Sequence, residues 1–345
     1  MKLAELAGWI PIRLYWESSR LMVDWCYRGT TRLSEPFFDQ TVERCLSNPF
    51  NLLFRHQTPV EVLGEWQAGG PASQPTGFIF HMSRCGSTLI SQMLAALPQN
   101  LVVSEAGTID TVLRSNLIEP SVTDDQRILW LQWLVSALGR RNGQEKHYFI
   151  KFDSWHTLEL PLIKRAFPNV PWVFVYREPI EVIVSNLKRT TGRMFPGPLG
   201  ASLLGLDPST IFEMQREEYS ARMVARFCEV ALEHYGSGAL LINYRQLPDV
   251  VFDSLLDFFE VDYSAADRDL MFNASQFDAK DPTVRFVNDD AAKTREATDP
   301  VRQMADRWVK EPYEELEAAR RASVTADKLS RHEGTTQSCA KKSLL

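Results

Sequence analysis

The sequence predicts an α/β fold in which helices flank a central parallel sheet. Two observations predict it. Short, continuously apolar runs recur along the chain, and stretches with helical spacing separate them. Strands that are apolar along their whole length are typical of a parallel sheet that helices cover on both faces.

Five apolar runs are expected to form the strands of this sheet. Stretches such as Pro168–Pro171 lie between them and are expected to form turns, because Gly, Pro and Asn interrupt both helices and strands. The expected strands are Gly77–Met82, Leu101–Ser104, Tyr148–Phe152, Trp172–Tyr176 and Ala239–Asn243.

The stretches between these strands predict helices. Asp124–Leu138 begins with two aspartates, which suit the positive end of a helix dipole. Ser209–Tyr235 is expected to form a long charged helix that ends at Gly236. The other expected helices are Thr88–Leu97, Ile180–Arg189 and Val250–Phe259.

Composition changes along the chain predict three parts. Residues 1–76 are rich in aromatic side chains that need burial, so they are expected to form a small N-terminal lobe packed on the core. The Gly- and Pro-rich loop Gln67–Pro75 precedes the α/β domain, expected over residues 77–324. Residues 325–345 are polar and have little to bury, which predicts a disordered tail.

Charge and cysteine content exclude several functional classes. Lys+Arg 38 against Asp+Glu 44 gives a net charge of −6, which argues against a general binder of nucleic acid or of anionic membranes. No apolar run approaches the ~20 residues that span a bilayer. The five scattered cysteines form no C-x-x-C pair, so no disulfide framework or zinc site is indicated. A cytoplasmic location is expected.

The stretch Phe80–Ile90 (FHMSRCGSTLI) predicts a phosphate-binding turn. An apolar strand ends there, one glycine follows, and a helix begins, so free N–H groups and the helix dipole would face an anion. Arg84 offers a charged fork, Gly86 permits close approach, and Ser83, Ser87 and Thr88 offer hydroxyls. The alternative is a simple helix cap.

This turn is not a Walker A loop, which would have Gly in place of His81 and Lys in place of Ser87. A second anion grip is expected in Val173–Leu187. There Arg177 leaves a strand end and Ser185 lies eight residues later. The alternative for Arg177 is a surface salt bridge to Glu178 or Glu181.

Together these motifs, about ninety residues apart, resemble the sulfotransferase family that uses 3′-phosphoadenosine-5′-phosphosulfate (PAPS). The family's fold is a P-loop-like three-layer sandwich. A third segment, Ile242–Val261, is similar to the family's strand–helix segment with a Tyr near the adenine. The resemblance implies these binding residues: Ser83, Arg84, Cys85, Gly86, Ser87, Thr88 and Leu89 for the 5′-phosphosulfate, Arg177 and Ser185 for the 3′-phosphate, and Tyr244 for the adenine.

The chain departs from the cytosolic branch of that family. The Gly-rich basic C-terminal motif is absent, and Lys293 and Arg295 are the candidates to replace it. The histidine base two residues after the strand lysine is also absent, because Phe152 and Asp153 follow Lys151. In this respect the sequence resembles the bacterial and Golgi-type branches.

The resemblance implies transfer of a sulfuryl group from PAPS to a hydroxyl or amine of a small-molecule acceptor, releasing PAP. Arg84 would bind the 5′-phosphosulfate, and Lys151 would neutralise charge on the bridging oxygen. Glu105 is the favoured base, with Asp153 and His156 as alternatives. A surface carboxylate for Glu105 and a structural role for His156 remain open.

Two other functions remain open. One is a metal-dependent P-loop phosphotransferase, and the other is a noncatalytic nucleotide-binding protein of the same fold. No metal is expected, because the six histidines are dispersed. A homodimer is possible. The acceptor site is expected from three segments: the N-terminal lobe, residues 190–208 and residues 275–295.

Overall fold

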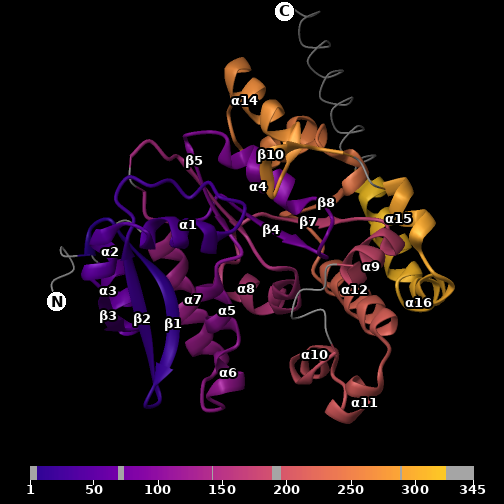
Figure 1. Cartoon of the computed structure of the whole chain (residues 1–345), viewed down its shortest axis with the longest axis horizontal. Helices are drawn as coiled ribbons and strands as arrows, with labels where there is room; N and C mark the ends of the chain where they lie inside the picture. The colour runs from indigo at the N-terminus through magenta and orange to yellow at the C-terminus, as the bar shows by residue number, and fades with distance from the viewer. Residues whose placement is uncertain (1–5, 69–73, 142, 189–195, 288–289, 324–345) are drawn as a thin grey trace, which may run out of the picture.

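The computed structural model describes residues 6–68, 74–141, 143–188, 196–287 and 290–323 (Figure 1). Its centre is a parallel five-stranded sheet in the order β5-β6-β4-β7-β8. The strands are β4 (Gly77–His81), β5 (Asn100–Ser104), β6 (His147–Lys151), β7 (Trp172–Tyr176) and β8 (Ala239–Asn243). The predicted α/β class is confirmed, and each strand begins and ends within one residue of its expected range.

Helices cover both faces of this sheet (Figure 1). Helix α4 (Ser87–Ala95) packs with α14 (Ala265–Ser275) on one face. On the other face lie α7 (Asp124–Leu138), α8 (Leu160–Ala166), α9 (Pro179–Lys188) and α12 (Arg216–Glu233). The strand order explains this division. The chain moves one way from β4 to β5 and the opposite way afterwards, and right-handed crossovers then place the connecting helices on opposite faces.

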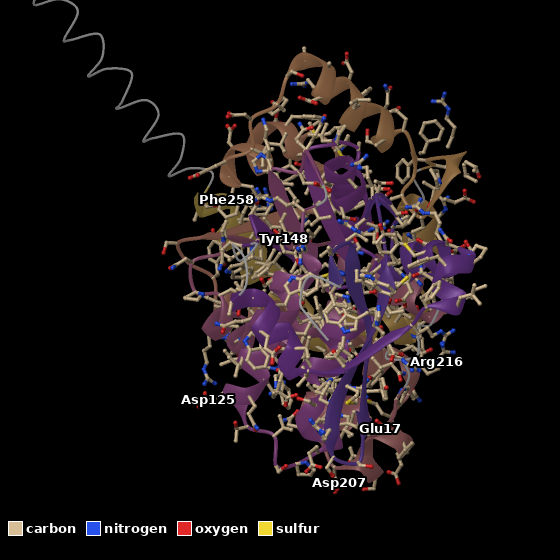
Figure 2. The ribbon with its side chains drawn as sticks, turned by 90° about the vertical axis from the view of Figure 1, so that its left-hand side faces the viewer. Glu17, Asp125, Tyr148, Asp207, Arg216 and Phe258 are labelled. Carbon is tan, nitrogen blue, oxygen red and sulfur yellow. The ribbon has the colours of Figure 1, made fainter. Side chains whose placement is uncertain are left out.

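Aromatic side chains fill the space between the sheet and its helices. The rings of Phe80 and Phe152 stack with centroids 4.6 Å apart. Tyr148 lies in the interior, whereas Glu17, Asp125 and Asp207 lie at the periphery (Figure 2). Every residue of β4 to β7 except His147 is buried, which is why these strands are apolar throughout.

The prediction of one helix over Ser209–Tyr235 is wrong. Two helices, α11 (Pro208–Glu213) and α12, are separated by extended backbone at Met214 and Gln215. Asp207 caps α11 by accepting the Ser209 N–H at 2.8 Å, and α11 packs on α10 (Pro198–Leu204). The turn between the helices has no Gly or Pro, so its sequence continues the helical pattern. Val250–Phe259 is helical as expected, but it begins as a π-helical turn.

The N-terminal segment forms a separate antiparallel sheet in the order β1-β2-β3. Its strand β1 packs on α5 (Gly107–Leu113) and α7, and its helix α3 packs on α7. The aromatic side chains are therefore buried partly against the α/β core. The elements are β1 (Trp9–Glu17), β2 (Arg20–Tyr27), α1 (Phe38–Leu46), α2 (Pro49–Leu53), β3 (His56–Pro59) and α3 (Glu61–Ala68).

The remaining elements surround the sheet. They are α5 (Gly107–Leu113), α6 (Ser115–Ile118), η2 (Ser154–Glu159), η4 (Tyr244–Gln246), η5 (Val251–Leu255), α13 (Leu256–Phe258), β9 (Phe277–Asp278), β10 (Asp281–Arg285), α15 (Asp290–Glu296), α16 (Asp299–Trp308) and a helix over residues 310–323. Among the described residues, no helix has the length and apolar character needed to cross a bilayer. The expected tail and residues 190–195 of the expected acceptor insert lie outside the described ranges.

Candidate functional site

The turn between β4 and α4 has a backbone that suits an anion. Ser83, Arg84 and Gly86 all have positive φ, at 74°, 51° and 87°. Side-chain-bearing residues avoid this region because of steric strain, and such outliers cluster at functional sites. Left-handed residues before a helix N-terminus also turn successive N–H groups toward one point, which makes a concave anion site.

Gly86 is required by its surroundings as well as by its φ. A Cβ there would lie 2.6 Å from Leu247 Cδ1 and 2.9 Å from Tyr244 Cδ2. The segment that follows β8 is therefore packed directly on the turn after β4. This packing brings the first and third predicted motifs together.

The other residues of the turn divide by orientation. The Cys85 thiol is buried and donates to the Val175 carbonyl at 3.0 Å, so only its backbone faces the turn. Thr88 Oγ1 accepts from Lys151 Nζ at 3.2 Å. Ser83 Oγ lies 3.4 Å from Asn186 Oδ1 on α9. Ser87, at the start of α4, is buried.

Arg177 lies beside this turn. Its Nη1 donates to the Arg84 carbonyl at 3.3 Å, and its Nε donates to Glu181 Oε2 at 2.6 Å. The salt bridge foreseen as an alternative for Arg177 thus exists, but it is buried: the two side chains are 5% and 6% exposed. A buried ion pair of this kind fixes the guanidinium at the edge of the sheet.

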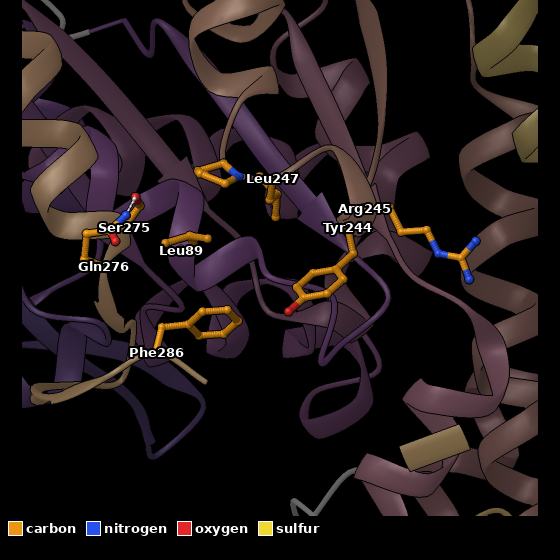
Figure 3. A pocket seen from close by; sticks show the side chains of 8 residues that line it. Leu89, Tyr244, Arg245, Leu247, Ser275, Gln276 and Phe286 are labelled. Carbon is orange, nitrogen blue, oxygen red and sulfur yellow. Dashed lines mark hydrogen bonds between the residues drawn. The ribbon is translucent and has the colours of Figure 1, made fainter. Parts of the chain in front are cut away.

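Tyr244 connects Arg177 to a cavity. The Arg177 Cζ lies 4.1 Å from the centroid of its ring, a cation–π contact. The cavity measures about 330 Å³ and is lined by Leu89, Tyr244, Arg245, Leu247, Pro248, Ser275, Gln276 and Phe286. Figure 3 shows the two rings, Tyr244 and Phe286, facing this space, whereas the Arg245 side chain points away. Its size and lining suit a flat, partly apolar group.

Lys151 and Glu105 form an ion pair at the ends of β6 and β5. The Lys151 side chain is 1% exposed and that of Glu105 is 20% exposed. Glu105 has φ 53°, so a third strained residue lies at this edge of the sheet. Burial raises the pKa of Glu105, but the charge of Lys151 and contact with His81 outweigh it and hold the pKa well below its usual range. Glu105 is therefore ionised.

His81 supports the same carboxylate. Its Nδ1 accepts the Ser83 N–H at 3.0 Å, so the ring proton is assigned to Nε2. That Nε2 lies 2.9 Å from the Phe152 carbonyl and 3.6 Å from Glu105 Oε1. His81 therefore links the phosphate turn to Glu105, a role that the sequence did not reveal.

The sequence model described as "Sulfotransferase family" matches residues 75–264, more than half of the chain. This chain belongs to the sulfotransferase family. No curated protein sequence matches it. The matched segment contains the phosphate turn, Glu105, Lys151, Arg177 and Tyr244. Neither the first 74 residues nor the β9–β10 hairpin lies within it.

Three solved sulfotransferase structures are similar to this sulfotransferase. The sulfotransferase domain from the curacin biosynthetic pathway has 15% identity and a TM-score of 0.41, over 71% of this chain and 96% of that chain. A sulfotransferase from Alicyclobacillus acidocaldarius has 14% identity and a TM-score of 0.40, over 72% of this chain and 96% of that chain. A sulfotransferase from Mycobacterium avium has 13% identity and a TM-score of 0.39, over 69% of this chain and 81% of that chain. Family membership follows from the sequence match.

Asp153 and His156 have local contacts in this sulfotransferase. The Asp153 N–H donates to His156 Nδ1 at 3.1 Å, at the start of η2. His156 is 1% exposed, and its Nε2 lies 3.4 Å from Asp110 Oδ1. These contacts are those of a buried structural histidine and a cap.

The residues expected at the 3′-phosphate lie on two packed helices of the sulfotransferase. Ser185 is half-buried on α9, and Lys293 and Arg295 lie on α15, which packs against α9. An ion pair between Lys188 and Glu296 joins the two helices. The structure therefore places the two segments that carry these candidates side by side.

Two residues near Lys151 were not predicted. Phe37, just before α1, and Lys280, in the turn between β9 and β10, both approach the Lys151–Glu105 pair. Neither carries a motif, so only the fold reveals them. Within the described ranges, no three His, Cys, Asp or Glu side chains are grouped so that they could hold a metal ion.

Proposed function

We propose that this sulfotransferase transfers a sulfuryl group from PAPS to a hydroxyl or amine of a small molecule, releasing PAP. One observation carries the proposal: Arg177 lies between the Arg84 carbonyl and the ring of Tyr244. A buried guanidinium is thus adjacent to an anion-binding turn and to an aromatic cavity. This combination suits a nucleotide with two separate phosphate positions.

The residues fit the parts of the donor. The N–H groups after Ser83, with Arg84 and Thr88, would hold the 5′-phosphosulfate. Arg177 and Ser185 would hold the 3′-phosphate, with Lys293 or Arg295 as further candidates. Tyr244 and the cavity beside it would receive the adenine, since aromatic rings stack on bases.

Lys151 would stabilise the leaving group, and Glu105 would act as the base. The acceptor oxygen or nitrogen bonds to sulfur while the bond from sulfur to the bridging oxygen breaks, and the electron pair stays on the 5′-phosphate. Lys151 stabilises this charge, and Glu105 takes the proton of the acceptor. Donor binding would draw the Lys151 ammonium from Glu105 to the bridging oxygen, which frees the carboxylate to act as a base.

Binding experiments test the donor assignment. Isothermal titration of the whole chain with PAP, AMP and Mg–ATP compares nucleotides that differ in the 3′-phosphate and the triphosphate. We expect PAP to bind at least tenfold more tightly than AMP. Preference for Mg–ATP would favour the metal-dependent phosphotransferase.

Transfer is tested separately. Cell extract incubated with the protein, PAPS and EDTA is analysed by mass spectrometry for products heavier by one sulfuryl group. We expect such products. PAP binding without any transfer over a broad panel of hydroxyl and amine acceptors would favour the noncatalytic nucleotide-binding protein instead.

A further inference from the structure

Lys280 lies in the two-residue turn of the β9–β10 hairpin. Asp278 Oδ1 accepts the N–H groups of Lys280 at 2.8 Å and Asp281 at 3.2 Å. This Asx-type turn fixes the backbone at the hairpin tip. The carboxylate of Asp278 is thereby engaged with the turn.

The aromatic ring of Phe37 brings Lys280 and Lys151 together. Lys151 Nζ lies 5.3 Å from the ring centroid, and Lys280 Nζ lies 5.5 Å from it. Both distances are within the range of a cation–π contact. Phe37 and Lys280 both lie outside residues 75–264, so these two groups come from parts of the chain beyond the family match.

Two cations and two carboxylates surround Lys280, so with its own ammonium the positive charges outnumber the negative ones. Lys280 is exposed at the hairpin tip, but partial desolvation of its ammonium and the positive charges of Arg84 and Lys151 lower its pKa to about 8. The carboxylates of Glu105 and Asp278 oppose this effect. Glu105 is already paired with Lys151. Three cations, Lys280 included, therefore face two carboxylates, and this excess of positive charge favours a bound anion.

We propose that Lys280 is a third catalytic cation, held by Phe37, which donates hydrogen bonds to the nonbridging oxygens of the sulfuryl group. The inference rests on the proposed function and extends it. Arg84 and Lys151 serve the 5′-phosphate and its bridging oxygen, whereas Lys280 faces them from the hairpin. The group in transfer would thus be held between the phosphate turn and the β9–β10 hairpin.

In the transfer step Lys280 exchanges no proton. The acceptor atom forms its bond to sulfur as the bond to the bridging oxygen breaks, the proton goes to Glu105, and the electron pair remains on PAP. Lys280 keeps its ammonium charge and stabilises the negative oxygens of the sulfuryl group throughout.

The donor and its product separate this role from general binding, because PAP lacks the sulfuryl group. Affinities for PAPS and PAP are measured by isothermal titration for the wild type, Lys280→Met, Lys280→Arg and Phe37→Leu. Arg285→Met is the control on the same hairpin, where Arg285 contacts Phe277. Phe54→Leu is the control in the N-terminal lobe, where Phe54 is 55% exposed.

We expect Lys280→Met to weaken PAPS binding about tenfold, the order of a lost charge-assisted hydrogen bond, and to leave PAP binding unchanged. Lys280→Arg should recover much of the loss, Phe37→Leu should show a smaller loss for PAPS, and both controls should behave as the wild type. Equal effects on PAPS and PAP, or no effect on either, would overturn the assignment to the sulfuryl group. A wild type that binds neither nucleotide would overturn the proposed function itself.

Discussion

The guanidinium of Arg177 lies over the ring of Tyr244, with its Cζ 4.1 Å from the centroid. Each residue directly follows a strand, and these strands, β7 and β8, are neighbours in the sheet. The residues just before them, Tyr176 and Asn243, both donate to Glu317 Oε1, at 2.6 and 2.9 Å. A carboxylate on the helix over residues 310–323 thus ties together the two strand ends that carry Arg177 and Tyr244.

The effect of Arg177 on PAP binding can be measured apart from its effect on stability only if Glu181, its ion-pair partner, is neutralised as well. Arg177→Met alone leaves Glu181 buried without its cation, which costs about 3–5 kcal/mol of stability. In Arg177→Met with Glu181→Gln, we expect a folded protein whose PAP affinity is at least tenfold lower, about 1.4 kcal/mol. Thermal denaturation and isothermal titration check the two effects. Wild-type PAP affinity in the double variant would contradict the role of Arg177.

Gly86→Ala should abolish tight PAP binding. The new Cβ would collide with Leu247 and Tyr244, and alanine is strained at φ 87°. Gly205→Ala is the matched control, because Gly205 has φ 63° and no atom within 4 Å of an added Cβ. The control should lose about 1 kcal/mol of stability and keep its PAP affinity, as measured by titration. Similar PAP affinities in the two variants would argue against close packing of Gly86.

Glu105→Gln should reduce turnover by about 10²–10⁴ because it removes the base, while PAP affinity stays the same. The depressed pKa of Glu105 also predicts that kcat/KM does not decline over the usual range of glutamate titration, near pH 4.3. Steady-state rates between pH 4 and 8 measure both effects. Full turnover in this variant would transfer the role to Asp153 or His156.

Glu317→Gln should make the free energy of unfolding less dependent on pH in the acidic range. Although burial raises the pKa of Glu317, hydrogen bonds from Arg320, Tyr176 and Asn243 lower it to about 2. The ionised carboxylate therefore stabilises the fold above the unfolded pKa, near 4.3, and this contribution is lost as pH falls through about 2. We expect the variant to lose about 1–3 kcal/mol at pH 7 and the difference to shrink toward pH 2.

Chemical denaturation across this pH range measures the effect of Glu317. Glu314→Gln, at an exposed position on the same helix, is the control and should change little. A difference between wild type and Glu317→Gln that stays constant down to pH 2 would show that the carboxylate charge is not its source.

The proposed role of Lys280 predicts that kcat/KM declines at alkaline pH. With its pKa lowered to about 8, the ammonium is charged below that pH and loses its proton above it. Arg84, Lys151, Glu105 and Asp278 are the charged groups that face it. The wild-type kcat/KM for PAPS should therefore fall as pH rises through about 8, whereas Lys280→Arg should stay active at higher pH. A limb that persists unchanged in Lys280→Met would belong to another group.

The sheet could be predicted because its strands must be apolar on both faces. Runs such as Trp172–Tyr176 are too short for buried helices and too apolar for a surface sheet. The helix over Ser209–Tyr235 was wrong because packing of α11 on α10, rather than local propensity, ends the first helix at Glu213.

The grouping of the candidate site residues could be predicted where a residue follows a strand in the sequence. Arg84, Glu105, Lys151, Arg177 and Tyr244 all lie near strand ends, and parallel strands bring these ends to one edge. The sequence left Glu178 or Glu181 open as a surface ion-pair partner of Arg177, whereas the structure pairs Arg177 with Glu181 and buries both side chains. His81, Phe37 and Lys280 were missed because their contacts depend on segments that are distant in sequence.

Glu317 also lies beyond the family match, like Phe37 and Lys280. A recombinant fragment limited to residues 75–264 would retain the parallel strands and the glycine turn, yet it would lack the carboxylate that joins β7 to β8 and the ring that covers Lys151. Both flanks of the matched region thus contribute contacts to the candidate site, and a shortened protein meant to retain the proposed activity should include them.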